Sequence, residues 1–401
     1  NYTWPGVTGL AEDVRRWGHW VREEAYKRIG HLYPPIEITK EMVAERPDLA
    51  SYKGKKLTVI AYIWARTVKS PNPQFSHVDV PLATTFILYK VKTGKCGFYK
   101  RAKNGTKLNR GASFQCWASN TPITKEYIYQ KFRNKEAGAS LIAIILQGDK
   151  SRLYITPDPD QEILAKEAFP GWVPRLEMEQ NSRDLLSGRG YGIKFWHELF
   201  SNRQLVALTT NSELIRDIFR DNPQVQKQSS YDSVIRLFLA FTLDKCADYW
   251  SSICSWHNSK ALIRNTFGRQ AIPMVWDYAE VNPFSDSTGN WLSMLDWVVK
   301  ALLNCSCYNN GHVELANAYS QNISKNKVIS TDPPYYDNIS YAELSDFFYI
   351  WLRYMIANDY PSLFETVLVP KEQELISLRY RHSDLKSAEK YFLDGMQQTM
   401  R

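Results

Sequence analysis

The sequence predicts an α/β fold, and three observations support this class. β-type patterns dominate residues 51–157, helical periodicity dominates residues 158–270, and residues 271–401 hold two strand-like stretches that each lead into a helix. A chain that mixes both kinds of element in this way is typical of layered α/β architectures. Because 401 residues exceed the size of one compact core, we expect units with these bounds, preceded by an N-terminal helix and linker at residues 1–50.

Residues 9–30 are expected to form the first helix, since Leu10, Val14 and Trp17 recur at helical spacing and Gly30 ends the pattern. The β-rich unit follows with three strand-like stretches, of which the last resembles a hairpin that turns at a Gly-Asp pair. These stretches are residues 57–66, 80–90 and 141–155, and the pair is Gly148-Asp149.

The helical region begins at Asp158-Pro159, a pair that suits the cap and the first turn of a helix. Strand-like residues 272–284 then lead into a helix expected at residues 291–303. A short extended stretch, residues 326–330, delivers the chain to an acidic turn. The helix after this turn has a continuous apolar face, which we expect to pack against the core. Further helical stretches are residues 196–219 and 229–250.

Charge and composition narrow the classes of function. The net charge of +8 and the pI near 9.0 suit a polyanionic partner, and they suit a solvated basic face equally well. Residues 91–110 carry seven Lys or Arg and no acid, which indicates either a nucleic-acid contact surface or a solvated hairpin. Without a bilayer-length apolar run, a secretory signal or regularly spaced cysteines, we expect a soluble cytoplasmic protein with reduced thiols.

The strongest chemical signal is the sequence Asp332-Pro333-Pro334-Tyr335 before the last of these helices. Two prolines fix the backbone and remove two N–H donors, so the carbonyl of Pro333 is expected to face a ligand instead of a ladder partner. Asp332 and this carbonyl can each accept one hydrogen of an exocyclic amine, while Tyr335 stacks on the ring that carries the amine. The alternative is an ordinary Pro-rich turn after a buried strand.

An amine held in this way keeps its lone pair exposed and can attack a methylsulfonium group in line. A base inside a duplex is out of reach, so the substrate has to be single-stranded or flipped out. The neighbours Tyr336, Asp337 and Asn338 are expected to form the rim of the substrate pocket. Asp337 also suits an ordinary turn, and Asn338 also suits a helix cap.

Three longer stretches resemble the DUF1156 group of adenine-specific DNA methylases, which carry a zinc-ribbon insert. They begin at Gly9, Phe267 and Thr331, and the third contains the Asp-Pro-Pro-Tyr motif. The resemblance implies a partial Rossmann-like methyltransferase sheet around residues 272–370, with residues 51–157 as the zinc-ribbon-like insert. It also implies S-adenosylmethionine as cofactor, DNA as partner, and defence or restriction proteins as further candidate partners.

In that family the Gly-rich loop that binds S-adenosylmethionine lies upstream of the first helix. We therefore expect this chain to be the middle and catalytic part of a longer methylase, and we assign no cofactor-binding residue. Two local segments are weaker candidates for the loop, because residues 187–192 lack a preceding strand and residues 282–290 contain a single glycine. Within the second segment, Asn282 and Phe284 are expected to line the substrate pocket, with a plain strand-to-helix connection as the alternative.

The zinc ribbon has departed from the family pattern. Ser70 and Phe75 stand where the family has cysteines, and of the later Cys-x-x-Cys pair Cys116 remains. A structural zinc site needs four nitrogen or sulfur ligands. Two other residues would restore the count if they converged on the site, namely His77 and Cys96. We predict that no metal is bound and that Phe75 and Trp117 fill the space by packing.

These observations together predict S-adenosylmethionine-dependent methylation of an exocyclic amine of a base in DNA, at adenine N6 before cytosine N4. The alternative is a non-catalytic DNA-binding or assembly module derived from such a methylase. The lost zinc ligands favour this alternative, and the intact Asp-Pro-Pro-Tyr motif opposes it. RNA or a protein side chain would present the same amine geometry and forms a third substrate class.

Overall fold

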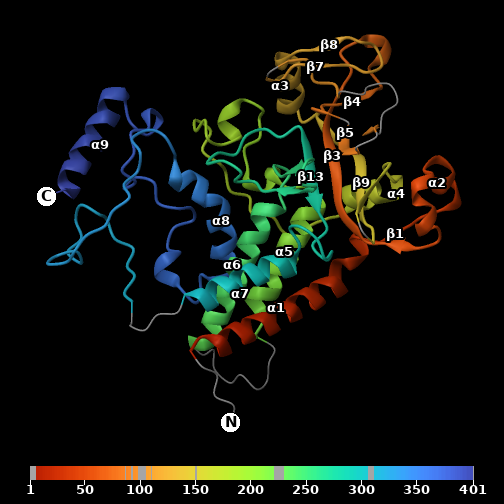
Figure 1. The fold of residues 1–401 in the computed structure, drawn as a ribbon. Coiled ribbons are helices and arrows are strands. Elements are labelled where there is room, and N and C mark those ends of the chain that lie inside the picture. The colour runs from red at the N-terminus through yellow and green to blue at the C-terminus, as the bar shows by residue number, and fades with distance from the viewer. Residues whose placement is uncertain are drawn as a thin grey trace.

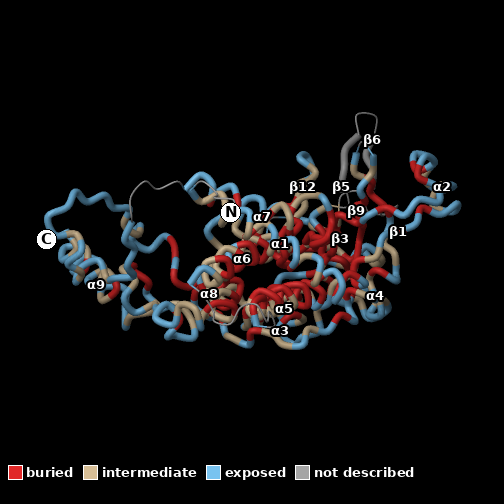
Figure 2. The backbone as a smooth tube through the Cα atoms, turned by 90° about the horizontal axis from the view of Figure 1, so that it is seen from below, coloured by how far each residue is buried: buried red, intermediate tan, exposed pale blue. Residues whose placement is uncertain are grey.

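The computed structural model describes residues 6–85, 87–91, 94–97, 105–109, 111–149, 151–220, 230–305 and 311–400 (Figure 1). Helices and strands both contribute to it, which confirms the mixed α/β class. One large cluster of buried apolar residues runs through the sheet and the helical layer beside it. Figure 2 shows this buried centre in red, with more exposed segments at both ends of the molecule.

The central sheet is built around β3 (Val59–Lys69), whose side chains are almost all buried. Its apolar run is typical of a strand that is covered on both faces. β9 (Gly138–Gln147) and β13 (Asp277–Val281) pair with β3 along its two edges, β10 (Arg152–Ile155) extends the sheet beyond β9, and β4 (Asp79–Pro81) pairs with the C-terminal end of β3. All of these pairings are antiparallel.

The predicted hairpin is confirmed, because β9 and β10 lie on either side of Gly148-Asp149. Of the basic stretch 91–110, residues 92–93, 98–104 and 110 lie outside the described residues. A hairpin of strands also interrupts the region that was predicted to be helical. The small ladders pair β1 (Ile36–Glu37) with β2 (Lys56–Leu57), β5 (Ile87–Val91) with β6 (Gly94–Gly97), β7 (Phe114–Gln115) with β8 (Pro122–Ile123), and β11 (Ser255–His257) with β12 (Leu262–Arg264).

The longer helices α1 (Thr8–Ile29), α5 (Asn202–Asp217), α6 (Ser230–Tyr249), α7 (Trp291–Asn304) and α8 (Tyr341–Ile356) form a layer beside the sheet (Figure 1). α1 packs on α5 and α7, while α6 packs on α7 and on α8. The apolar face predicted for the last of these is confirmed, since its large side chains are buried in the core. The remaining helices are α2 (Lys40–Glu45), α3 (Lys125–Arg133), α4 (Pro159–Glu167) and α9 (Leu385–Thr399).

Local sequence signals explain where several helices begin. Asp158 caps α4 by accepting a hydrogen bond of 3.0 Å from the N–H of Asp160, and Pro159 is the first helical residue, as predicted. Ser201 and Gln204 form a capping box at the start of α5. Among the helices of the described segments, none combines the length and the apolarity that crossing a membrane requires.

The strand predicted at residues 326–330 is not formed. Val328 and Ile329 are exposed, and this stretch pairs with no strand of the described chain. An extended segment becomes a strand when a neighbour satisfies its backbone N–H and C=O groups. The predicted strand at 272–284 does form as β13, but it pairs antiparallel with β3. Residues 272–370 therefore contribute to an antiparallel sheet, and no Rossmann-like sheet is seen within the described segments.

Candidate functional site

The Asp332-Pro333-Pro334-Tyr335 motif runs into a turn at Tyr336-Asp337 shortly before α8, and residues 332–338 together form the Asp332 turn. The side chains of Asp332 and Tyr335 are exposed, and the Tyr335 hydroxyl donates a hydrogen bond of 3.1 Å to Oδ1 of Asp332. The Pro334 carbonyl accepts the N–H of Tyr336 at 3.2 Å, whereas no backbone N–H of the described segments donates to the Pro333 carbonyl. A carboxylate, a carbonyl and an aromatic ring are thus brought together in one turn.

Backbone strain marks the next residue, since Tyr336 has a φ of 53°. This left-handed conformation is uncommon for a bulky residue and costs on the order of 1–3 kcal/mol. Three contacts hold it: the carbonyl accepts the N–H of Ser377 at 2.9 Å, the hydroxyl donates to Glu389 at 2.9 Å, and the ring meets Phe392 edge-on with centroids 5.3 Å apart. The C-terminal part of the chain therefore fixes the end of the turn, and strain of this kind is common at functional sites.

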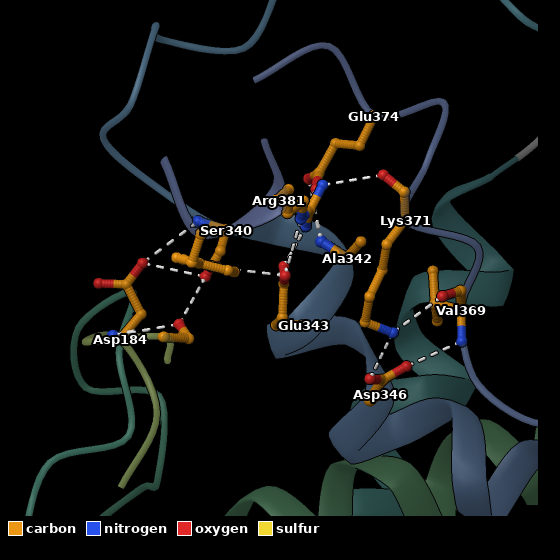
Figure 3. A network of polar contacts seen from close by, with 11 residues as sticks. Asp184, Ser340, Ala342, Glu343, Asp346, Val369, Lys371, Glu374 and Arg381 are labelled. Carbon is orange, nitrogen blue, oxygen red and sulfur yellow. Dashed lines mark hydrogen bonds and ion pairs between the residues drawn. The ribbon is translucent and has the colours of Figure 1, made fainter. Parts of the chain in front are cut away.

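The first turn of α8 is capped by two carboxylates from distant parts of the chain (Figure 3). Asp184 accepts hydrogen bonds from the backbone N–H and the hydroxyl of Ser340 at 3.2 and 3.0 Å, and Glu374 accepts the N–H of Ala342 at 3.0 Å. The unpaired N–H groups and the dipole of a helix N-terminus favour such anions. The helix that follows the motif consequently begins at a fixed place.

Two buried carboxylates of α8 pair with cations from the same C-terminal segment (Figure 3). Glu343 pairs with Arg381, which also contacts Glu374 at 2.7 Å, and Asp346 contacts Nζ of Lys371 at 2.8 Å. Burial raises the pKa of Asp346, and the hydrogen bond with Lys371 opposes this increase. Burial lowers the pKa of Arg381, but its hydrogen bond and charge interaction with Glu343 outweigh that effect and raise it.

A cavity of about 380 Å³ opens beside this network. Its walls come from α8, from the segment that carries Lys371 and Arg381, and from Tyr391 of α9. Carboxylates outnumber the lysine and arginine side chains in its lining, and Arg381 is already held by two of them. The cavity therefore suits a ligand that donates hydrogen bonds rather than an anion.

The predicted pocket rim is exposed. Asp337 and Asn338 both lie on the surface, and the N–H of Asn338 donates to the carbonyl of Tyr335 at 3.0 Å. Ser340, not Asn338, occupies the cap position of α8, so the alternative role of Asn338 as a helix cap is wrong. The contribution of Asp337 and Asn338 to a substrate pocket stays a prediction.

Asn282 and Phe284 lie in the core. The amide nitrogen of Asn282 donates to the carbonyl of Val59 at 2.8 Å, and its Oδ1 accepts the N–H of Phe284 at 3.0 Å. The Phe284 ring packs edge-on against Tyr26 and Tyr33. These contacts hold the chain between β13 and α7. No hydrogen bond or ring contact among the described residues joins them to the Asp332 turn, and their predicted role in the substrate pocket stays a prediction.

The two candidate cofactor loops use their glycines for internal packing. A Cβ added at Gly188 would lie 2.0 Å from the carbonyl oxygen of Ser182, and one added at Gly192 would lie 2.9 Å from Cα of Arg133. Gly289, in the second loop, has a φ of 79° and its carbonyl accepts the indole N–H of Trp250 at 2.8 Å. Glycines of both segments thus contact other parts of the chain, and the role of either segment as a cofactor loop stays a prediction.

Two of the positions at which the resemblance implies zinc ligands, Ser70 and Ser119, lie beside Cys116. Cys116 is buried; burial opposes its ionisation, but hydrogen bonds from Ser119, Ser70 and backbone N–H groups outweigh burial and lower the pKa of the thiol. Asn120, directly after Ser119, has a left-handed φ of 58°. Of the four cysteines that the resemblance implies, three are absent.

The packing predicted for this space is only partly observed. Phe75 is half-buried, but Trp117 is 37% exposed, so the prediction that Trp117 fills the space is wrong. Small hydroxyl side chains around Cys116 occupy it instead. Within the described segments, no three His, Cys, Asp or Glu side chains are placed to share a metal ion. The side chain of Cys96 lies outside the described part.

The residues that position α8 were not predicted from the sequence. Asp184, Glu374 and Arg381 are separated from their partners by up to 156 residues, and no local pattern marks them. A signal did exist in the helix itself, because Glu343 and Asp346 interrupt an otherwise apolar face. Acidic residues in such positions are buried only when partners neutralise them.

No family model matches the chain, and neither the curated proteins nor the solved structures provide a match. The resemblance to adenine-specific DNA methylases accordingly rests on the sequence motifs.

Proposed function

We propose that this chain takes part in S-adenosylmethionine-dependent methylation of an exocyclic amine of a base in DNA, at adenine N6 before cytosine N4. The observation that carries the proposal is the turn at Asp332-Pro333-Pro334-Tyr335, which groups two hydrogen-bond acceptors and an aromatic ring. Its strained neighbour Tyr336 and the capped start of α8 support the proposal, because a site needs a rigid frame.

In this proposal the turn holds the amine. The Tyr335 hydroxyl uses Oδ1 of Asp332, which leaves Oδ2 for one amine hydrogen, and the Pro333 carbonyl accepts the other. Both acceptors draw the nitrogen out of conjugation with the ring, so its lone pair becomes available. The Tyr335 side chain, tied to Asp332, lies beside the amine site and stacks on the base.

The methyl donor is a separate part of the proposal. S-adenosylmethionine supplies a methylsulfonium group when bound, and no residue of the described segments is assigned to hold it. The Rossmann-like sheet that the resemblance implies is also part of the proposal, since Val328 and Ile329 are exposed and pair with no strand of the described segments. DNA, further defence or restriction proteins and a cytoplasmic location complete the proposal.

The decisive experiment is substitution of Asp332 in the full-length protein. We expect Asp332→Ala to reduce transfer of labelled methyl groups to DNA by at least about 100-fold, because removing one charge-stabilising contact typically has this effect. Asp394→Ala, which removes an exposed carboxylate of α9, is the matched control and should leave the rate unchanged. Retention of methyl transfer by Asp332→Ala would refute the role of the turn.

The alternative of a non-catalytic DNA-binding or assembly module is favoured by the loss of the zinc ligands. It predicts that the full-length wild-type protein binds DNA but leaves adenine and cytosine unmethylated. Mass spectrometry of nucleosides from DNA incubated with this protein separates the two functions.

A further inference from the structure

A second cavity, also of about 380 Å³, shares no lining residue with the cavity beside α8. It is lined by β3, the loop after β4, the segment that carries Lys107, the β11–β12 hairpin and the start of β13, so five separate parts of the chain build it. Its lining combines acceptors, donors and indole rings, among them Thr84, Lys107, Trp256, Asn258, Trp276 and Asp277.

A fixed carboxylate stands in this cavity. Oδ1 of Asp277 accepts the hydroxyl of Thr84 at 2.9 Å, while Oδ2 receives no hydrogen bond from the described segments. The wall behind it is rigid, because Arg66 donates to the carbonyl of Val275 at 2.8 Å and its backbone N–H donates to the carbonyl of Trp276 at 2.8 Å. Oδ2 is therefore a preorganised acceptor at the edge of the cavity.

Indole rings supply flat apolar surface next to this acceptor. Trp276 is buried and packs edge-on against Phe114 and Tyr191, so its position is fixed. Trp256 is half-buried, and the guanidinium of Arg152 lies 5.3 Å from its ring centroid. A carboxylate acceptor beside indole rings matches a planar heterocycle that carries an amine.

Positive charge adjoins the cavity. Lys107 lines it and acts on Asp277 through its charge. In the sequence Lys107 belongs to the stretch 91–110, which has seven Lys or Arg and no acid. Such a stretch suits a phosphate backbone. Single-stranded nucleic acid combines both features, because its bases are unpaired and its phosphates are close by.

We propose that this cavity binds an unpaired, amine-bearing nucleobase of a single-stranded nucleic acid, with Oδ2 of Asp277 accepting a hydrogen of the exocyclic amine. Trp256 provides stacking surface, and Lys107 neutralises a neighbouring phosphate. The site is independent of the Asp332 turn and does not require methyl transfer. It would hold a strand without reacting with it.

The test compares two probes that differ at the relevant atom. Cytosine carries an amine at position 4 where thymine carries a carbonyl oxygen, so Asp277 should favour the former. We expect fluorescence anisotropy to show about tenfold tighter binding of a labelled deoxycytidine octamer than of a deoxythymidine octamer at pH 7.5. Equal binding of the amine-bearing and the carbonyl-bearing octamer in both DNA and RNA, or tighter binding of the carbonyl-bearing octamer in both, would overturn the proposal without any variant.

Variants show which residue causes the preference for cytosine over thymine. Asp277→Asn keeps an acceptor for Thr84 and should bring the ratio of the two affinities close to one, while Lys107→Ala should weaken both octamers by a similar factor and leave the ratio unchanged. Lys300→Ala, an exposed lysine of α7, is the matched control and should change neither affinity. Persistence of the preference in Asp277→Asn contradicts the assignment.

Ribonucleotide probes distinguish the two sources of such a base. Cytidine and uridine octamers differ at the same position, so the same ratio is measured with RNA. Preference for the amine-bearing base in DNA, in RNA or in both supports the proposal and identifies the polymer that supplies the base. If neither DNA nor RNA shows a preference, the proposed base-binding role of the cavity is refuted, whatever the outcome of the Asp332 experiment.

Discussion

Asp277 shows how burial changes the chemistry of one side chain. Burial raises the pKa of its carboxyl above the usual 3.8, and the hydrogen bonds from Thr84 oppose this effect. In the unfolded chain the same acid titrates near its usual value. The folded state thus binds the proton more tightly. The stability gained from this difference is fully present below the unfolded pKa and is lost as the pH rises through the folded pKa.

A pH series on Asp277→Asn tests this directly. The amide does not titrate, so the variant should gain stability relative to the wild type as the pH rises from about 4 towards 7. Urea unfolding at several pH values gives the free energy of unfolding of both proteins. A difference that stays constant over this range, or that changes in the opposite direction, contradicts the raised pKa.

At the scale of elements, hydroxyl side chains surround a buried thiol in the β-rich unit. Ser70 and Ser119 lie against Cys116, and Asn120 adopts the left-handed backbone that a glycine would allow. Hydrogen bonds from these hydroxyl groups satisfy the buried thiol.

Restoring the thiols should restore metal binding. We expect the variant Ser70→Cys, Phe75→Cys, Ser119→Cys to bind about one zinc ion per chain, since four thiolates then meet the requirement of a structural site. Elemental analysis and the shift of the melting temperature with added zinc provide the measurement. The same variant with Cys116→Ser is the control and should bind zinc more weakly. Stoichiometric zinc in the purified wild-type protein would contradict the prediction that no metal is bound.

At the scale of the whole molecule, one buried ion pair joins the helical layer to the sheet. Arg203 of α5 donates to Glu280 of β13 at 2.7 Å, and both side chains are fully buried. The guanidinium also lies 3.8 Å from the ring centroid of Tyr62 and donates to the carbonyl of Leu32 at 3.1 Å. Desolvation offsets much of the attraction, but losing one partner leaves a buried charge uncompensated.

Glu280→Gln should therefore destabilise the protein by about 4 kcal/mol. Replacing both partners, in Arg203→Met with Glu280→Leu, should cost clearly less, because no charge then remains in the core. Urea unfolding of the two variants and the wild type gives the comparison. Equal losses in the single and the double variant would show that the pair contributes through shape and not through charge.

Much of the element content could be predicted. The β9–β10 hairpin, the start of α4 and the helix α8 all follow from signals within about 20 residues, which is the range of turn residues, caps and apolar periodicity. Strand pairing was not predictable in this way. The stretch 326–330 has a strand-like pattern, but whether it pairs depends on a partner elsewhere in the chain.

The same distinction between local and long-range interactions applies to the candidate site. By itself the sequence determined the chemistry of the Asp332 turn, because two prolines, an acid and a tyrosine in succession dictate local backbone and functional groups. Only the tertiary structure decided what holds that turn, since Asp184, Glu374 and Arg381 meet α8 from distant segments. It also decided that β13 pairs with β3. Periodicity and turn chemistry act between near neighbours, whereas burial and charge pairing depend on residues that folding alone brings together.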